Sequence, residues 1–198
     1  MKNIILGFAI ATTTLAFCNG NKSAENQNLS NRTQSISQTD NVNLTTSSVK
    51  DAKNTVSIKE IISAYLQMKN AFTEDNSNGA ASAGKKLGTA FKNFDKSALT
   101  EALKKTYEDV EADAIEHAEH IGANGGNIEH QREHFELLSK DIYDLVKAFG
   151  GGQVLYKDFC PMYNNGKGAF WLSETKEIQN PYFGKEMLNC GTITEELK

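Results

Sequence analysis

Apolar residues recur at steps of three and four positions over four stretches of the chain, the spacing of one face of an α-helix. The pattern predicts helices over residues 58–75, 80–94, about 97–123 and 128–149. Ser57 and Glu60 have the spacing of a capping box for the first helix, and Asp95 or Ser97 can cap the third. The connections are short, so the sequence predicts an all-α fold, an up-and-down four-helix bundle.

The region after the fourth predicted helix has a different pattern. Two short runs rich in aromatic and β-branched residues, 154–156 and 169–172, are typical of strands. The Asn-Asn-Gly sequence at 164–166 predicts a turn between them, and a second turn is expected at 180–184. We therefore expect an irregular C-terminal tail with a short β-hairpin that packs on the bundle.

The N-terminus has the pattern of an export signal. Residues 1–17 place a lysine before a short apolar run that ends directly before Cys18. Cys18 is therefore a candidate lipidation site, with ordinary cleavage as the alternative. Residues 18–55 are rich in Asn, Ser, Thr and Gln and contain no aromatic residue, which predicts a disordered tether. We expect an exported protein of the periplasm or outer membrane, held by a lipid anchor, with residues 56–198 forming a single domain.

Charge and motifs narrow the classes of function. The formal net charge is −4, and no stripe of Lys and Arg runs along the chain, so nucleic acid is not an expected partner. The sequence has no nucleophile elbow, no phosphate-binding glycine loop and no His-Glu-x-x-His motif. The three glycines at 150–152 follow a helix and not a strand, so they terminate that helix. We expect a protein that is not an enzyme.

All four histidines of the chain lie between residues 117 and 134, in the third and fourth predicted helices. Folding these helices back on each other brings His117, His120, His130 and His134 to one end of a helical hairpin. His130 and His134 are four residues apart, a spacing common in metal-chelating helices. By helical phase, His117 lies on the inner face of its helix, and His120 and His130 are more exposed. The alternative is that these are surface or core histidines of an ordinary polar hairpin.

The predicted domain also contains two cysteines, Cys160 and Cys190, with Met162 and Met187 within three residues of them. Thiolates and thioethers are soft ligands that suit Cu(I), and the imidazoles could complete such a site. Two alternatives compete with metal binding: a structural disulfide that closes a loop of about 30 residues, and unpaired buried thiols with methionines that only pack. Metal binding and the disulfide can alternate, because oxidation removes the thiolate ligands.

The order of these motifs resembles the domain of unknown function 3347. The resemblance covers roughly residues 58–195 and rests on the segments 128–135, 155–162, 171–173, 180–184 and 187–191. That family occurs as small exported proteins and as C-terminal domains of periplasmic adaptor subunits in copper and silver efflux pumps. The resemblance implies a helical bundle that handles metal outside the cytoplasm, with copper as the expected metal. The matching candidate ligands are His120, His130, His134, Cys160, Met162, Met187 and Cys190.

The sequence thus predicts a cell-envelope metal-binding protein that acts in metal buffering, delivery or efflux. The expected cofactor is a copper ion, with zinc or no metal as the alternatives. The expected partners are the metal ion, the membrane through the lipid anchor, and an efflux-pump or other envelope protein. The alternative function is a non-catalytic periplasmic interaction module with a structural disulfide between Cys160 and Cys190.

Overall fold

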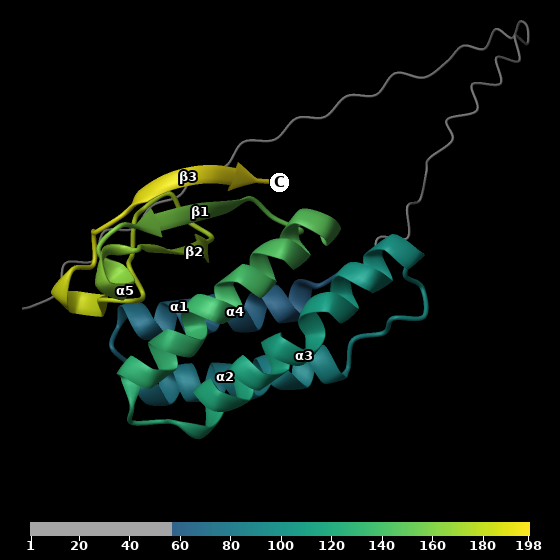
Figure 1. Cartoon of the computed structure of the whole chain (residues 1–198), viewed down its shortest axis with the longest axis horizontal. Helices are drawn as coiled ribbons and strands as arrows, with labels where there is room; N and C mark the ends of the chain where they lie inside the picture. Colours follow the sequence, from purple (N-terminus) through teal and green to yellow (C-terminus); the bar gives the residue numbers. More distant parts are fainter. Residues whose placement is uncertain (1–56) are drawn as a thin grey trace, which may run out of the picture. The chain divides into compact units, whose positions relative to one another are not determined.

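The computed structural model of the chain describes residues 57–198. The predicted signal sequence, the candidate lipidation site Cys18 and the predicted tether lie outside the described residues. Helices occupy the first part of the described region and a small antiparallel sheet occupies the second (Figure 1). None of the helices described is both long enough and apolar enough to cross a membrane.

Four substantial helices form in the predicted order. They are α1 (Lys59–Thr73), α2 (Ser77–Lys92), α3 (Glu101–Ala123) and α4 (Ile128–Phe149). Each packs mainly against its neighbours in sequence, α1 against α2, α2 against α3 and α3 against α4 (Figure 1). The apolar stripes meet in a core that includes the fully buried rings of Tyr65, Phe72 and Phe135. The fourth predicted helix has the same bounds in the structure.

The start of α3 differs from the prediction. The helix begins at Glu101 and not after Asp95 or Ser97. Thr100 is its N-cap, and the Thr100 hydroxyl accepts a hydrogen bond from the backbone N–H of Leu103 at 3.3 Å. The Asp95 carboxylate instead accepts the backbone N–H of Ser97 at 2.8 Å. Such local bonds compete with a helix, so Asp95 and Ser97 form the turn that leads into α3.

The capping box predicted at the start of α1 does not form. Ile58 is the N-cap residue and has no side chain that can accept a hydrogen bond. The Ser57 hydroxyl accepts only the nearby N–H of Lys59, at 3.3 Å. Ile58 is 2 % exposed, so burial of an apolar side chain anchors this end of the helix.

The tail forms three strands, where the sequence predicted two. They are β1 (Leu155–Cys160), β2 (Ala169–Ser173) and β3 (Thr192–Leu197). The order across the sheet is β2-β1-β3, and both pairs are antiparallel. The all-α class is therefore corrected to helices with a three-stranded sheet. The third strand was missed because most of its side chains are polar and exposed, so it lacks the pattern of a half-buried strand.

The predicted turns of the tail do form. The Asn-Asn-Gly sequence lies in a single helical turn, α5 (Tyr163–Gly166), between β1 and β2. Asn164 and Asn165 have positive φ angles of 51° and 56°, which asparagine adopts more readily than most residues. A 3₁₀ turn, η1 (Gly184–Glu186), lies in the long connection to β3, at the end of the turn expected at 180–184.

The sheet is fixed to α1 and α4 by buried polar contacts. The Tyr65 hydroxyl lies 2.8 Å from the Ser139 hydroxyl on α4 and accepts the backbone N–H of Leu172 on β2 at 3.0 Å. Arg132 on α4 donates from Nε to the Pro181 carbonyl at 2.8 Å and from Nη2 to Asp75 at 2.7 Å. One side of α4 is thus held by the tail, while another side faces α3.

Candidate metal centre

The turn between α3 and α4 is closed by specific backbone contacts. The Asn127 side chain caps α4 by accepting the N–H of His130 at 3.3 Å. Gly126 has a φ of +99°, a conformation that favours glycine, and its N–H donates to the Ser77 hydroxyl at 2.7 Å. The turn is therefore tied to the start of α2, and the first turn of α4 is held in place.

A buried glutamine sets how α3 and α4 lie against each other. Gln131 is fully buried, and its Nε2 donates to the carbonyl of Ile121 on α3 at 2.8 Å and to the carbonyl of Ser77 at 3.1 Å. Its Oε1 accepts the Ser77 hydroxyl at 2.6 Å. Because the amide has partners on α2 and α3, it holds the neighbouring histidines of α4 opposite α3.

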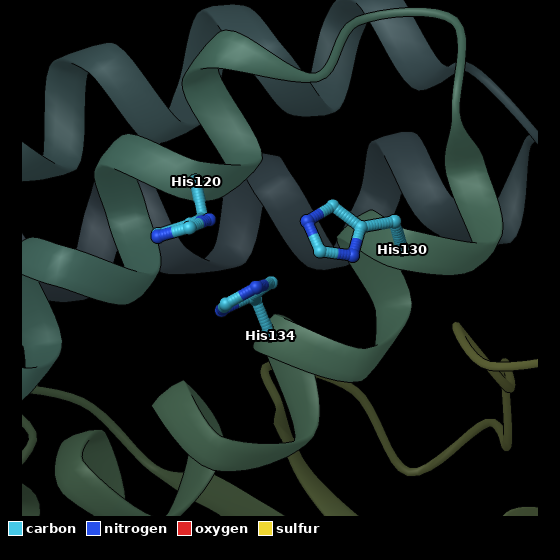
Figure 2. Close-up of side chains that lie close together, drawn as sticks. All are labelled: His120, His130 and His134. Atoms are coloured by element: carbon cyan, nitrogen blue, oxygen red, sulfur yellow. The ribbon is translucent and has the colours of Figure 1, made fainter.

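Three histidines converge beside this turn. His120 comes from α3, and His130 and His134 come from α4, with their rings turned toward one another (Figure 2). Each offers a ring nitrogen, and these atoms lie within 4.8 Å of one another. The rings of His120 and His134 stack with centroids 4.3 Å apart, and the ring of His130 stands edge-on to His134 at 4.7 Å. The prediction that these histidines gather at one end of the hairpin is confirmed.

The three-histidine group lies near the surface. The side chain of His120 is 46 % exposed and that of His130 is 34 % exposed, in agreement with the exposure expected from helical phase. An ion bound by three imidazoles would still have coordination positions open, as in metal sites that exchange ligands.

The fourth histidine lies behind this group. The Nδ1 atom of His117 on α3 is 3.2 Å from the Nδ1 atom of His134 on α4. The helical phase predicts His117 on the inner face of its helix, and His117 is not among the candidate ligands predicted from the sequence. Its position on the inner face of α3 is the sequence feature that points to a contact with α4, where His134 lies.

The two inner histidines are neutral at pH 7. Burial is the largest cause that lowers the pKa of His117 and of His134 below the ordinary value of 6.5. The imidazoles of His120 and His130 lower the pKa of His134 further. A neutral imidazole keeps a lone pair on one nitrogen, which is the form that binds a metal ion.

Carboxylates surround the group. Glu116 approaches Nε2 of His120 at 3.9 Å, and Glu133 approaches Nδ1 of His130 at 3.4 Å. Both carboxylates are mostly exposed, so these contacts are weak in water. Glu119 is paired with Lys92 at 2.6 Å. Glu116 and Glu133 can orient the rings of ligating histidines.

The helical region that contains the histidines matches a known protein family. The model of a family described as "Protein of unknown function (DUF3347)" matches residues 61–153. The helical region belongs to the DUF3347 family. The match contains α2, α3, α4 and most of α1, and so includes all four histidines. No curated protein and no solved structure matches the chain.

The cysteines lie beyond the matched part of the DUF3347 domain. Cys160 is buried at the end of β1, and Cys190 is partly exposed in the segment before β3. Their Sγ atoms are 3.2 Å apart. The hydrogen bond between the thiols and burial raise the pKa of Cys190, so this residue is a thiol at pH 7.

The structure does not bring the predicted sulfur and imidazole ligands into one group. Within residues 57–198, the close group of potential metal ligands consists of His120, His130 and His134, with no cysteine. Met162 is 56 % exposed in the turn after β1, and Met187 is half-buried after η1. The DUF3347 domain therefore presents a three-imidazole group, and the tail presents a separate pair of thiols.

Proposed function

We propose that this protein binds a transition-metal ion, with copper as the expected metal, through His120, His130 and His134. The proposal places it in the cell envelope, in metal buffering, delivery or efflux. The observation that supports it most is the convergence of three imidazoles from two helices, with ring nitrogens within 4.8 Å of one another. Small shifts of these rings would let three nitrogens contact one ion at about 2.0 Å.

The chemistry of the donors favours copper. Imidazole suits zinc, copper and nickel, and among divalent first-row metals Cu²⁺ binds nitrogen donors most strongly. The half-exposed positions of His120 and His130 give an ion direct access from solvent. A site of this kind suits an ion that is taken up and passed on, in contrast to a closed structural site with four protein ligands.

The four sulfur residues enter the proposal as a separate group of soft ligands. Thiolates and thioethers prefer Cu(I), so we assign them to the reduced ion. The close thiols of Cys160 and Cys190 are its centre, and Met162 and Met187 are the further candidates.

The cellular context of the proposal comes from the sequence. The predicted leader and Cys18 would place the protein in the periplasm or at the outer membrane, anchored by lipid. An efflux pump or another envelope protein would then exchange metal with it. We further propose that α1 to α4 form an up-and-down four-helix bundle, supported by the packing of each helix on its sequence neighbours.

A competition titration tests the metal proposal. The reduced protein is titrated under anaerobic conditions with Cu(I), Cu(II) and Zn(II) against a chromophoric chelator. We expect His130→Ala to weaken Cu(II) binding by at least about tenfold, because one of three ligands is lost. Glu129→Ala, at the exposed neighbouring position, is the matched control and should bind as the parent does. Absence of Cu(II) binding, or an unchanged affinity in His130→Ala, would refute the proposal.

The interaction module remains the second candidate because the two thiols lie close together. Sγ atoms 3.2 Å apart need to move by only about 1 Å to form a disulfide. Against this candidate, large aromatic side chains of the tail, such as Trp171 and Tyr182, are buried in the fold and offer little contact surface to a partner. It predicts that a thiol count finds neither Cys160 nor Cys190 free, and that added metal changes neither stability nor spectra.

A further inference from the structure

We infer that His117 is a positioning residue, whose hydrogen bond to Nδ1 of His134 directs Nε2 of His134 toward the metal. The inference rests on the proposed function of the three-histidine group. It assigns a role to the one histidine that this group leaves out.

The contact between the two rings defines the proton arrangement. Two Nδ1 atoms 3.2 Å apart share one hydrogen bond, in which one nitrogen carries the proton and the other accepts it. If His134 donates, its Nε2 carries a lone pair. If His117 donates, the Nε2 of His134 carries a proton and cannot bind a metal ion. Metal binding therefore requires the arrangement in which His134 donates and His117 accepts.

The surroundings of His134 fix the direction of its ring. The His120 ring stacks on it at 4.3 Å with an angle of 15°, and the His130 ring stands edge-on at 4.7 Å with an angle of 81°. The His117 ring lies at 5.4 Å and meets the Nδ1 edge. The His134 ring is therefore contacted on its face by His120 and at its Nδ1 edge by His117. Its other nitrogen, Nε2, is the one left to bind an ion.

The position of His117 suits a supporting role better than direct ligation. It lies one turn before His120 on α3 and is partly buried at the seam with α4. The charged and titratable groups that act on it are Glu116, Asp113, His120 and Lys140. Among the hydrogen bonds of the described residues, its ring makes one, and that bond goes to His134. Metal-binding histidines commonly need such a partner for their second nitrogen, and its loss lowers metal affinity.

The first test reads the proton directly. In ¹⁵N-labelled metal-free protein, long-range ¹H–¹⁵N spectra report which nitrogen of each histidine is protonated. We expect His134 to be protonated at Nδ1, and we expect His117→Phe to shift the proton to Nε2, the form that imidazole favours without a partner. A parent protein with His134 protonated at Nε2 would overturn the inference.

The second test measures metal affinity with Cu(II) as the probe. We expect His117→Phe to weaken binding by about 10- to 100-fold, and His117→Gln to weaken it less because its amide oxygen can still accept a hydrogen bond. Ile115→Ala, which removes partly buried apolar contacts of the same helix, is the control for lost stability and should leave the affinity unchanged. Parent-like affinity in His117→Phe would overturn the inference alone, whereas a parent protein that binds no metal would overturn the proposed function as well.

Discussion

Asp158 is a carboxylate in an unfavourable place. It is fully buried on β1, and neither of its oxygens has a hydrogen-bond partner. The opposite charge that acts on Asp158 is Lys69, which is itself buried and forms an ion pair with Glu174 at 2.9 Å. The buried group thus carries two carboxylates for one ammonium, and Asp158 is the surplus charge. Burial without a paired charge is among the most destabilising arrangements in a protein.

This position links stability to pH. Burial raises the pKa of Asp158 from 3.8 to about 7, so the folded protein holds a proton that the unfolded chain releases near pH 4. The protonated side chain favours folding below about pH 4, and that advantage is lost as pH rises from 4 to 7. Three pKa units correspond to at most about 4 kcal/mol.

Replacing Asp158 with Asn should remove this loss of stability at high pH, because the amide carries no charge. We expect Asp158→Asn to be about 2 kcal/mol more stable than the parent at pH 8 and nearly equal at pH 4. Urea unfolding at one-unit steps of pH measures the difference. Asp109→Asn is the matched control, because Asp109 is exposed on α3 and its ion pair with Lys105 contributes little. A variant that is less stable than the parent at pH 8 would show that the charge of Asp158 does not destabilise the folded protein.

At the scale of single residues, the clustering of the histidines could be predicted from the sequence, but the role of each histidine within the cluster could not. Two antiparallel helices joined by a short turn place residues at equal distances from that turn side by side, so His117 had to lie near His134. The contact between their Nδ1 atoms depends on side-chain rotamers, which spacing does not give. The sequence also could not show whether the thiols and the imidazoles share one site, because that depends on how the tail packs on the helices. In the structure the close group of ligands contains the imidazoles and no thiol.

At the scale of elements, the α3–α4 hairpin is the unit that builds the candidate site. Its two helices supply all four imidazoles, and its turn is held by Gly126 and Asn127. The buried face of α4 contains three polar residues, Gln131, Arg132 and Ser139. Gln131 is the one whose side chain bonds to both α2 and α3. The geometry of the site therefore depends on the partners of this amide.

Substitution of Gln131 tests that dependence. Gln131→Met keeps the side-chain length but removes the amide donor to the carbonyls of Ile121 and Ser77 and the acceptor of the Ser77 hydroxyl. We expect a loss of about 2–3 kcal/mol in the free energy of unfolding, together with weaker metal binding. Gln67→Met, at an exposed position of α1, is the control and should change stability by less than about 0.5 kcal/mol. If Gln131→Met unfolds at the same urea concentration as the parent, the hairpin does not need this network.

The helices could be predicted well because their apolar stripes are long and regular, and α4 has the predicted bounds. The β3 strand could not be predicted, because its side chains are mostly polar and exposed and only its backbone pairing with β1 defines it as a strand. The start of α3 was misplaced because Asp95 and Ser97 have the chemistry of caps but bond to each other.

The whole described region consists of a DUF3347 helical part and a tail that packs on it. The family match ends at residue 153, just before β1, so the histidines and the thiols belong to different parts of the molecule. Cys160 is held in the sheet, and Cys190 lies in the long connection that leads to β3. A bond between them would tie this connection to the sheet.

Oxidation of the purified protein should form that bond. With oxidised glutathione we expect an intramolecular disulfide between Cys160 and Cys190, seen as two lost thiols and as a peptide pair after digestion. The closed loop spans 30 positions, and its constraint on the unfolded chain is worth about 3–4 kcal/mol. Oxidation should remove Cu(I) binding by the thiols and leave Cu(II) binding by the histidines intact. Cys160→Ser should gain no stability on oxidation, and an equal gain in this variant would assign the effect to another cause.

X-ray absorption spectroscopy of the protein loaded with one equivalent of Cu(II) tests the central claim most directly. We predict a first shell that contains three imidazole nitrogens at about 2.0 Å, and a reduced imidazole signal in His130→Ala. A first shell made of sulfur, or a protein that retains no copper after gel filtration, would contradict the assignment of His120, His130 and His134 as the metal site.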